Sequence, residues 1–224
     1  MRPMYPVSLD IAGKLCLVVG GGKVAARKAR GLLAAGARVR VISPALHLRM
    51  EALLAEEGIE WQRKSFVPED VEGTFLVFAA TDNPQVQAAV LAAARSHNLL
   101  VNLADNPADC DFQVPAVLRR GELSISVATN GTTPAMAALV RRQLEAVIGE
   151  EYALLTALMG TVREEVLRLA SSEAEKKILF QKILQDDIVL WLRERQWTKV
   201  RQHLEEVIGR PVGPDLEVLF KENP

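Results

Sequence analysis

The first hundred residues alternate short apolar runs with longer amphipathic stretches. Four of the runs are mostly apolar, which is typical of strands buried in a parallel sheet. These four runs span residues 14–20, 39–43, 74–80 and 99–104. A further run, 60–66, has polar residues at alternate positions and predicts a strand near an edge of the sheet.

The stretches between these runs predict helices at residues 24–35, 46–57 and 84–97. The first two are followed by glycine, a common residue at the end of a helix, and Pro84 suits the first turn of the third. Strands that alternate with helices predict a right-handedly wound parallel sheet, and therefore an α/β fold.

The pattern changes near residue 105. Residues 114–131 read as two strands joined around Arg120-Gly121, which predicts a β-hairpin. A helix follows, with Thr132 or Thr133 as its N-cap and Pro134 at its first position. No strand signal remains after residue 150, where four short helices are expected. We therefore expect three regions, at residues 1–113, 114–149 and 150–224.

The predicted helix of the middle region has one apolar face, formed by Met136, Val140, Leu144 and Val147. An isolated hairpin is only marginally stable in water, so hairpin and helix together need a partner surface. That surface is either the first region of the same chain or a second copy. We favour the second copy, and hence a homodimer, because symmetric dimers are the commonest oligomers.

Composition and charge exclude some functions. The 224 residues are 49% hydrophobic with a formal net charge of −1, which argues against nucleic-acid binding through bulk charge. No apolar run reaches the roughly 20 residues of a membrane span, and the N-terminus does not resemble a signal peptide. The two cysteines, Cys16 and Cys110, form no CxxC pair, so neither a metal site nor a disulfide is expected. We expect a cytoplasmic protein that has no membrane partner.

A glycine turn connects the first strand to the first helix. Gly20, Gly22 and Ala25 match the pattern G-x-G-x-x-(G/A), in which the glycines permit a tight turn and close approach of a pyrophosphate. Lys23 and Val24 open the helix, whose free N–H groups would hold the anion. The turn predicts a dinucleotide site on a Rossmann-type parallel sheet.

The second strand ends in Ser43-Pro44, where dinucleotide-binding proteins often carry an acid for the ribose. No arginine follows immediately, as a 2′-phosphate would prefer. We expect Ser43 to donate a hydrogen bond to a ribose oxygen and the Ser43-Pro44 turn to expose backbone amides to the cofactor.

Polar residues also follow the fourth and fifth strands. Thr81 and Asp82 follow the fourth and Asp105 follows the fifth, so all three should face the crevice at the carboxyl end of the sheet. Asp82 is equally suited to cap the helix that begins near Pro84. Asp105 has an alternative reading as a loop cap, and Asn102 is expected to orient the loop.

Four segments together resemble the precorrin-2 dehydrogenase and siroheme synthase family over roughly residues 4–148. They are "VVGGGKVAARKARGLLAAGARVRVISP", "AATDNPQVQ", "VNLADNP" and "FQVPAVLRRGELSISVATNGTTPAMAALVRRQLE". The resemblance implies NAD-dependent oxidation of precorrin-2 to sirohydrochlorin, and insertion of ferrous iron by some members. It also implies a dimer built through the middle region, and a second strand that commonly ends in a small residue and proline. The long enzymes carry a methyltransferase domain beyond this region, so we do not expect this chain to methylate uroporphyrinogen.

The resemblance assigns roles to individual residues. Asp105 closes an N-x-x-D run and corresponds to the catalytic carboxylate, which would accept the substrate proton or assist iron entry. The tetrapyrrole carries eight carboxylates, and the "TNGTTP" segment before a helix is suited to bind one of them. The expected substrate-binding residues are Asn102, Thr129, Gly131, Thr132 and Thr133, although several family members have serine in place of Thr129. Iron would be a substrate, and no permanent metal site is expected.

A non-catalytic module that senses NAD or binds a tetrapyrrole is the alternative function. The two functions differ at Asp105, because an enzyme needs a working carboxylate there and a sensor does not.

Overall fold

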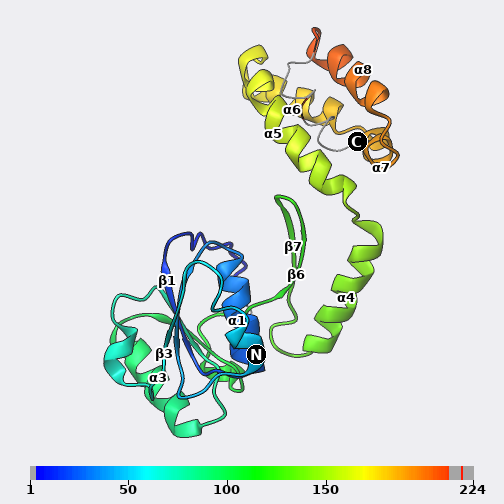
Figure 1. Cartoon of the computed structure of the whole chain (residues 1–224). Coiled ribbons are helices and arrows are strands. Elements are labelled where there is room, and N and C mark those ends of the chain that lie inside the picture. Colours follow the sequence, from blue (N-terminus) through cyan, green and yellow to red (C-terminus); the bar gives the residue numbers. More distant parts are fainter. Residues whose placement is uncertain (1–3, 212–217, 219–224) are drawn as a thin grey trace. The chain divides into compact units, whose positions relative to one another are not determined.

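The computed structural model describes residues 4–211 and 218, which belong to two compact units (Figure 1). The first unit comprises Met1–Val114 and Asn130–Thr132, and the second comprises Pro115–Thr129 and Thr133–Pro224. Among the described residues, no helix combines the length and the apolar character needed to cross a membrane.

The first unit is built on a five-stranded sheet in which every neighbouring pair of strands is parallel. The strand order is β3-β2-β1-β4-β5, so the chain moves outward from β1 in both directions. The strands are β1 (Leu15–Val19), β2 (Arg38–Ile42), β3 (Ile59–Gln62), β4 (Leu76–Ala79) and β5 (Leu100–Leu103). This arrangement confirms the predicted α/β fold with a Rossmann-type sheet.

Helices cover both faces of the sheet. Helices α1 (Lys23–Leu33) and α2 (Leu48–Glu51) lie on one face, while α3 (Pro84–Ser96) and the short 3-10 helix η1 (Pro68–Val71) lie on the other. Alternate strand residues enter the two cores: Cys16 and Val18 pack toward α1, and Leu17 and Val19 pack toward α3. Burial on both faces explains why β1, β4 and β5 are apolar at nearly every position.

Two predicted elements are shorter in the structure. The helix expected at residues 46–57 is reduced to α2, because His47 is extended and its N–H donates to the Gly21 carbonyl at 2.8 Å. The strand expected at residues 60–66 stops at Gln62, where a turn forms between Lys64 N–H and the Gln62 carbonyl at 2.9 Å. Phe66 then leaves the sheet and packs against the core under α3.

The second unit begins with the predicted hairpin of β6 (Ala116–Arg120) and β7 (Leu123–Val127). Gly121 in its turn has a φ of +53°, which a residue with a side chain rarely adopts. Helix α4 (Pro134–Val147) packs against both strands. Thr133 occupies the N-cap position of α4, although its side chain makes no capping hydrogen bond.

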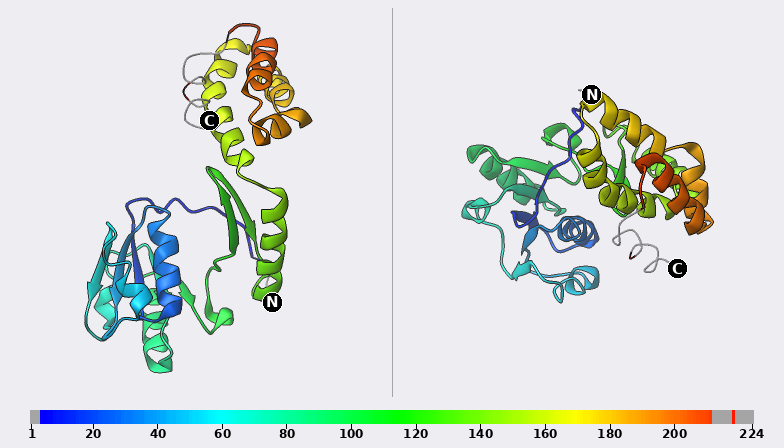
Figure 2. Two further views of the ribbon diagram at one scale, coloured as in Figure 1. Left: turned by 45° about the vertical axis from the view of Figure 1, so that its right-hand side comes forward. Right: turned by 90° about the horizontal axis from the view of Figure 1, so that it is seen from above.

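Four helices complete the second unit, as the sequence predicted. Figure 2 shows them as a bundle in yellow to orange. They are α5 (Glu151–Leu169), α6 (Glu173–Ile183), α7 (Asp186–Arg193) and α8 (Trp197–Ile208). Leu158, Ile183, Leu192 and Leu204, one from each helix, are almost fully buried and form the centre of the bundle core.

An ion pair fastens the start of α5 to α7. Arg193 donates from Nη2 and Nε to Oε1 of Glu151, at 2.7 and 3.2 Å, and the Glu151 side chain is only 7% exposed. Burial by itself would raise the pKa of Glu151, but the hydrogen bonds and charge of Arg193 outweigh it, so the pKa is lowered. Arg120 secures the preceding junction, since its Nε donates to the Ile148 carbonyl at 3.0 Å.

Candidate functional site

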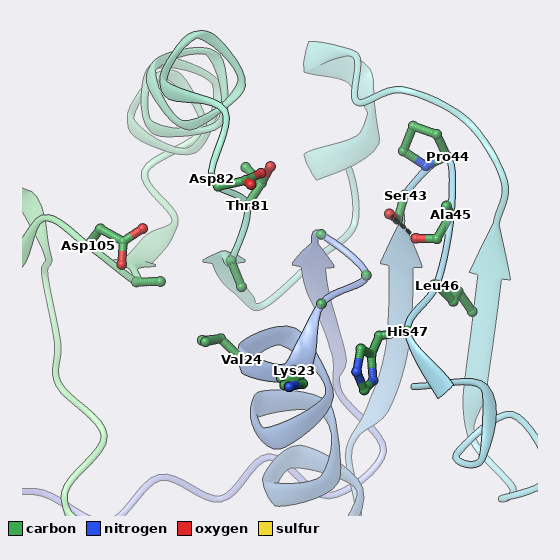
Figure 3. A pocket seen from close by; sticks show the side chains of 15 residues that line it. Lys23, Val24, Ser43, Pro44, Ala45, Leu46, His47, Thr81, Asp82 and Asp105 are labelled. Carbon is green, nitrogen blue, oxygen red and sulfur yellow. Dashed lines mark hydrogen bonds between the residues drawn. The ribbon is translucent and has the colours of Figure 1, made fainter. Parts of the chain in front are cut away.

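An open pocket of about 770 Å³ lies at the carboxyl ends of the strands in the first unit (Figure 3). Four segments line it: the turn after β1, the end of β2, the end of β4 and the end of β5. The lining residues are Gly20, Gly21, Gly22, Lys23, Val24, Ser43, Pro44, Ala45, Leu46, His47, Ala80, Thr81, Asp82, Ala104 and Asp105. The volume lies within the range of small-molecule and cofactor sites.

The glycine turn is shaped by close backbone approach. Gly20 has a φ of +124°, and a Cβ there would lie 2.1 Å from the Ala80 carbonyl oxygen. A Cβ on Gly21 would lie 2.1 Å from the Ala45 carbonyl oxygen, so this middle glycine is also required. The G-x-G-x-x-(G/A) pattern does not single out Gly21, although the run of three glycines is a signal for it.

Gly22 differs from the two glycines before it, because a Cβ there would meet no protein atom within 4 Å. The protein's own packing therefore does not require glycine at this position. Among the described hydrogen bonds, none uses the N–H groups of Gly22, Lys23 or Val24. The open space and the available donors at the start of α1 fit a pyrophosphate, and Ala25 beneath them is fully buried.

The end of β2 is held by internal hydrogen bonds. The Ser43 hydroxyl donates to the Ala45 carbonyl at 2.7 Å, and Trp61 Nε1 donates to the Ser43 carbonyl at 3.0 Å. Ser43 lines the pocket, but its hydroxyl proton is already used within the turn. The expected bond from Ser43 to a ribose therefore stays a prediction, which requires the hydroxyl to leave the Ala45 carbonyl.

His47 is a pocket residue that the sequence analysis did not assign to the cofactor site. Its Nδ1 accepts a hydrogen bond from the Arg49 N–H at 3.1 Å, so the neutral ring carries its proton on Nε2. Its backbone N–H binds the Gly21 carbonyl and thereby fixes the residue beside the glycine turn. Sequence spacing offered no signal for it, since the contact joins two separate loops.

The polar residues after β4 and β5 lie on the other side of the glycine turn from Ser43 and Pro44 (Figure 3). Asn83, and not Asp82, caps α3: its Oδ1 accepts from the N–H groups of Gln85 and Val86 at 3.0 and 3.2 Å. Asp82 is thereby left exposed at the pocket. Asp105 is exposed as well, and its Oδ2 accepts from Gln87 Nε2 at 3.5 Å.

Asn102 lies inside the unit and not in the pocket. Its Oδ1 accepts from Lys28 Nζ at 3.0 Å and its Nδ2 donates to the Phe112 carbonyl at 2.9 Å. Burial, together with the charge of Arg27, lowers the pKa of Lys28. The residue is 5% exposed and its amide groups already bind the protein, so the expected substrate contact of Asn102 stays a prediction that requires these bonds to open. Its expected role in orienting the following loop agrees with these contacts.

The pocket is built entirely from the first unit. Thr129 and Thr133 belong to the second, where the Thr129 hydroxyl oxygen accepts from the Thr133 N–H at 3.3 Å. Asn130 and Gly131 have φ values of +49° and +78°, so the segment turns sharply before α4. Within the described residues, no group of three or more His, Cys, Asp or Glu side chains is arranged to hold a metal ion.

Two family descriptions match the chain. Residues 7–116 match the family described as "Putative NAD(P)-binding", and residues 120–146 match "Sirohaem biosynthesis protein central". The first match covers the sheet and its pocket, and a nicotinamide dinucleotide is the cofactor class that it supports.

Individual relatives agree with these matches. A siroheme synthase of Methylobacillus flagellatus is 34% identical over 204 residues, which are 91% of this chain and 44% of the relative. A siroheme synthase of Nitrosomonas eutropha is 37% identical over 182 residues, 81% of this chain and 38% of the relative. The chain thus spans less than half the length of these curated relatives.

A solved structure is similar over nearly its full length. The protein named "SirC, precorrin-2 dehydrogenase" is 30% identical, with a TM-score of 0.76. The match covers 91% of this chain and 98% of that one, so the sheet, the middle region and the helical end are all included.

Proposed function

Because the chain belongs to the family of precorrin-2 dehydrogenases and siroheme synthases, we propose that it oxidises precorrin-2 to sirohydrochlorin with NAD. The observation that carries the proposal is the position of Asp105 in the same pocket as the glycine turn. A proton acceptor and a dinucleotide cradle are the two components that a dehydrogenase of this kind needs.

The glycine turn holds the cofactor in this proposal. The N–H groups of Gly22, Lys23 and Val24 donate to the pyrophosphate, and the residues from Ser43 to His47 border the adenosine half. Thr81 and Asp82 border the half that reacts. When bound, NAD supplies the acceptor for the hydride.

Asp105 takes the proton that leaves with the hydride. Its carboxylate is exposed at the pocket, so a substrate that enters there can reach it. Ionised aspartate is suited to this task near neutral pH. We infer that the same carboxylate assists deprotonation of the pyrrole nitrogens if ferrous iron, as a second substrate, enters the product.

We propose NAD over NADP because no arginine lines the pocket at the end of β2. Arg63 contacts this turn, but its Nε donates to the Pro44 carbonyl at 3.3 Å and the residue is not part of the pocket lining. A 2′-phosphate would need an arginine or lysine directed toward the ribose. Comparing the Kd of NADH and NADPH by fluorescence checks this point, with NADH expected to bind more tightly.

The segment before α4 is our candidate for binding a carboxylate of the tetrapyrrole. Thr129, Gly131, Thr132 and Thr133 precede a 14-residue helix, whose first N–H groups favour an anion. The Thr129 hydroxyl, whose oxygen accepts from Thr133, keeps its own proton for donation.

We also propose that the chain forms a homodimer through α4 and the hairpin. On α4 only Ala137 is buried, while Met136, Leu139 and Val147 are 55%, 47% and 59% exposed. Exposed apolar residues gathered on one helix mark an interface. A second copy supplies the covering surface that the described residues of one chain do not.

Anaerobic incubation with precorrin-2 and NAD tests the activity. We expect the absorbance of sirohydrochlorin and of NADH to rise together in equal amounts. Repeating the reaction with ferrous iron tests the second step. Tight NAD binding without turnover would instead favour the non-catalytic sensing module.

A further inference from the structure

One side-chain amide joins the two strand ends that carry the polar residues of the pocket. Gln87 lies in the first turn of α3 and is half-buried. Its Nε2 donates to the Thr81 carbonyl oxygen at 2.6 Å and to Asp105 Oδ2 at 3.5 Å. Thr81 follows β4 and Asp105 follows β5, so a single amide bridges two neighbouring strands.

The two hydrogen bonds of Gln87 differ in length, and the shorter one orients the amide. An amide NH₂ has two protons, and the shorter bond to a backbone carbonyl fixes where the second proton points. The carboxylate of Asp105 is the second acceptor within hydrogen-bond distance of this amide, at 3.5 Å. Among the contacts of the described residues, this is the only hydrogen bond or ion pair that reaches the Asp105 side chain.

Gln87 is an uncharged donor, whereas several charged side chains lie near Asp105. The other titratable side chains of the pocket are Lys23, His47 and Asp82. On the elements beside Asp105, Asp109 pairs with Arg95 of α3 at 3.4 Å. A carboxamide orients the carboxylate without adding a further charge to this set.

We propose that Gln87 is a positioning residue of the dehydrogenase, which orients the Asp105 carboxylate toward the pocket through this hydrogen bond. The inference rests on the proposed function, in which Asp105 accepts the substrate proton. Gln87 itself is absent from the pocket lining, so it acts through Asp105 and Thr81.

Two variants of the full chain test the proposal. Gln87→Glu places a negative charge beside Asp105, and a like charge disfavours the ionised carboxylate, so the variant should have a higher pKa at Asp105 than the wild type. The acidic limb of the kcat profile should therefore move to higher pH. Gln87→Leu keeps the volume but removes the donor, and kcat at neutral pH should fall by about tenfold to a hundredfold. The Kd for NAD, measured separately, should change far less than kcat.

Gln85→Glu is the matched control. Gln85 is exposed on the same helix and lies outside the pocket, so the same charge is added without touching Asp105. Its pH profile should coincide with that of the wild type. If Gln87→Glu and Gln85→Glu have the same profile, or if Gln87→Leu keeps the wild-type kcat, the positioning role is refuted.

A direct titration separates this inference from the proposed function. Carboxyl-¹³C labelling of aspartate, with Asp105→Asn to assign the resonance, reports the Asp105 pKa by NMR without any substrate. A raised pKa in Gln87→Glu supports the inference even if the wild type fails to oxidise precorrin-2, which would defeat only the proposed function. An unchanged Asp105 titration overturns the inference whatever the activity.

Discussion

Helices α1 and α4 differ in how much of each is buried. Helix α1 has 11 residues, and its four buried side chains, Ala25, Ala26, Ala29 and Leu32, pack on the sheet. Helix α4 is longer, with 14 residues, yet only Ala137 is buried. The reason is the size of the surface beneath each helix: a five-stranded sheet for α1 and a two-stranded hairpin for α4.

The difference assigns separate tasks to the two regions. The turn before α1 is complete within one chain, and Gly20 and Gly21 are required there because a Cβ at either would lie 2.1 Å from a backbone oxygen. Among the described residues, the apolar side chains of Met136, Leu139 and Val147 on α4 stay exposed, which agrees with the proposed interface. Substitutions at the pocket should therefore affect ligand binding and chemistry, and substitutions on α4 should affect assembly.

The largest effect is expected from Asp105→Asn. Asparagine keeps the size of the side chain but cannot take a proton near neutral pH, and loss of a general base costs roughly 10²–10⁴-fold in rate. Steady-state oxidation of precorrin-2 measures the loss, while NAD binding should persist. Asp109→Asn, in the same loop but outside the pocket, is the control. Near-native turnover by Asp105→Asn would show that this carboxylate is not the base.

Gly22→Asp should abolish cofactor binding. The new side chain fills the open space over the turn, and its charge repels the pyrophosphate, so the Kd for NAD should rise by about a hundredfold or more. Gly31→Asp adds the same charge on the same helix, where a side chain also meets no protein atom within 4 Å. Calorimetric titration of both variants with NAD separates the effect of a charge at the turn from the effect of a charge elsewhere on α1. Equal NAD affinity in the two variants would show that the pyrophosphate does not bind at this turn.

Met136→Glu should weaken the dimer. A buried carboxylate in an apolar interface is strongly unfavourable, so the dissociation constant should rise by about tenfold or more. Sedimentation velocity over a concentration series measures it. Lys177→Glu makes a larger change of charge at an exposed position of α6, outside the proposed interface, and should leave the dimer intact. A wild-type chain that sediments as a monomer at micromolar concentration would contradict the proposed assembly.

The smallest effect is expected from Arg193→Met in the helical bundle, far in sequence from both compared regions. The folded-state pKa of Glu151 is lowered, so the ion pair stabilises the protein above the ordinary glutamate range and is lost as the pH falls through the lowered value. The variant should be less stable than the wild type at pH 7, and the difference should vanish in acid. Urea denaturation at several pH values measures this difference in stability between the variant and the wild type. A difference that is the same at every pH would show that the ion pair is not its cause.

Sequence patterns of short range were sufficient for most of the fold. The strands of the sheet, the hairpin turn at Gly121 and the four last helices were predicted because periodicity and turn residues act locally. The glycine turn was found for the same reason, since Gly20, Gly22 and Ala25 are neighbours in the chain. Thr81 and Asp105 were placed at one edge because all parallel strands end on the same side.

Tertiary structure decided the contacts between segments that are distant in the sequence. His47 is tied to Gly21, the hydroxyl of Ser43 bonds within its own turn, and Gln87 reaches Asp105 across 18 residues. Asn102 turns inward because Lys28 and Phe112 offer partners for both ends of its amide. Periodicity reports which face of an element is apolar, whereas a hydrogen bond between loops depends on distances of a few ångströms that only the packed sheet sets.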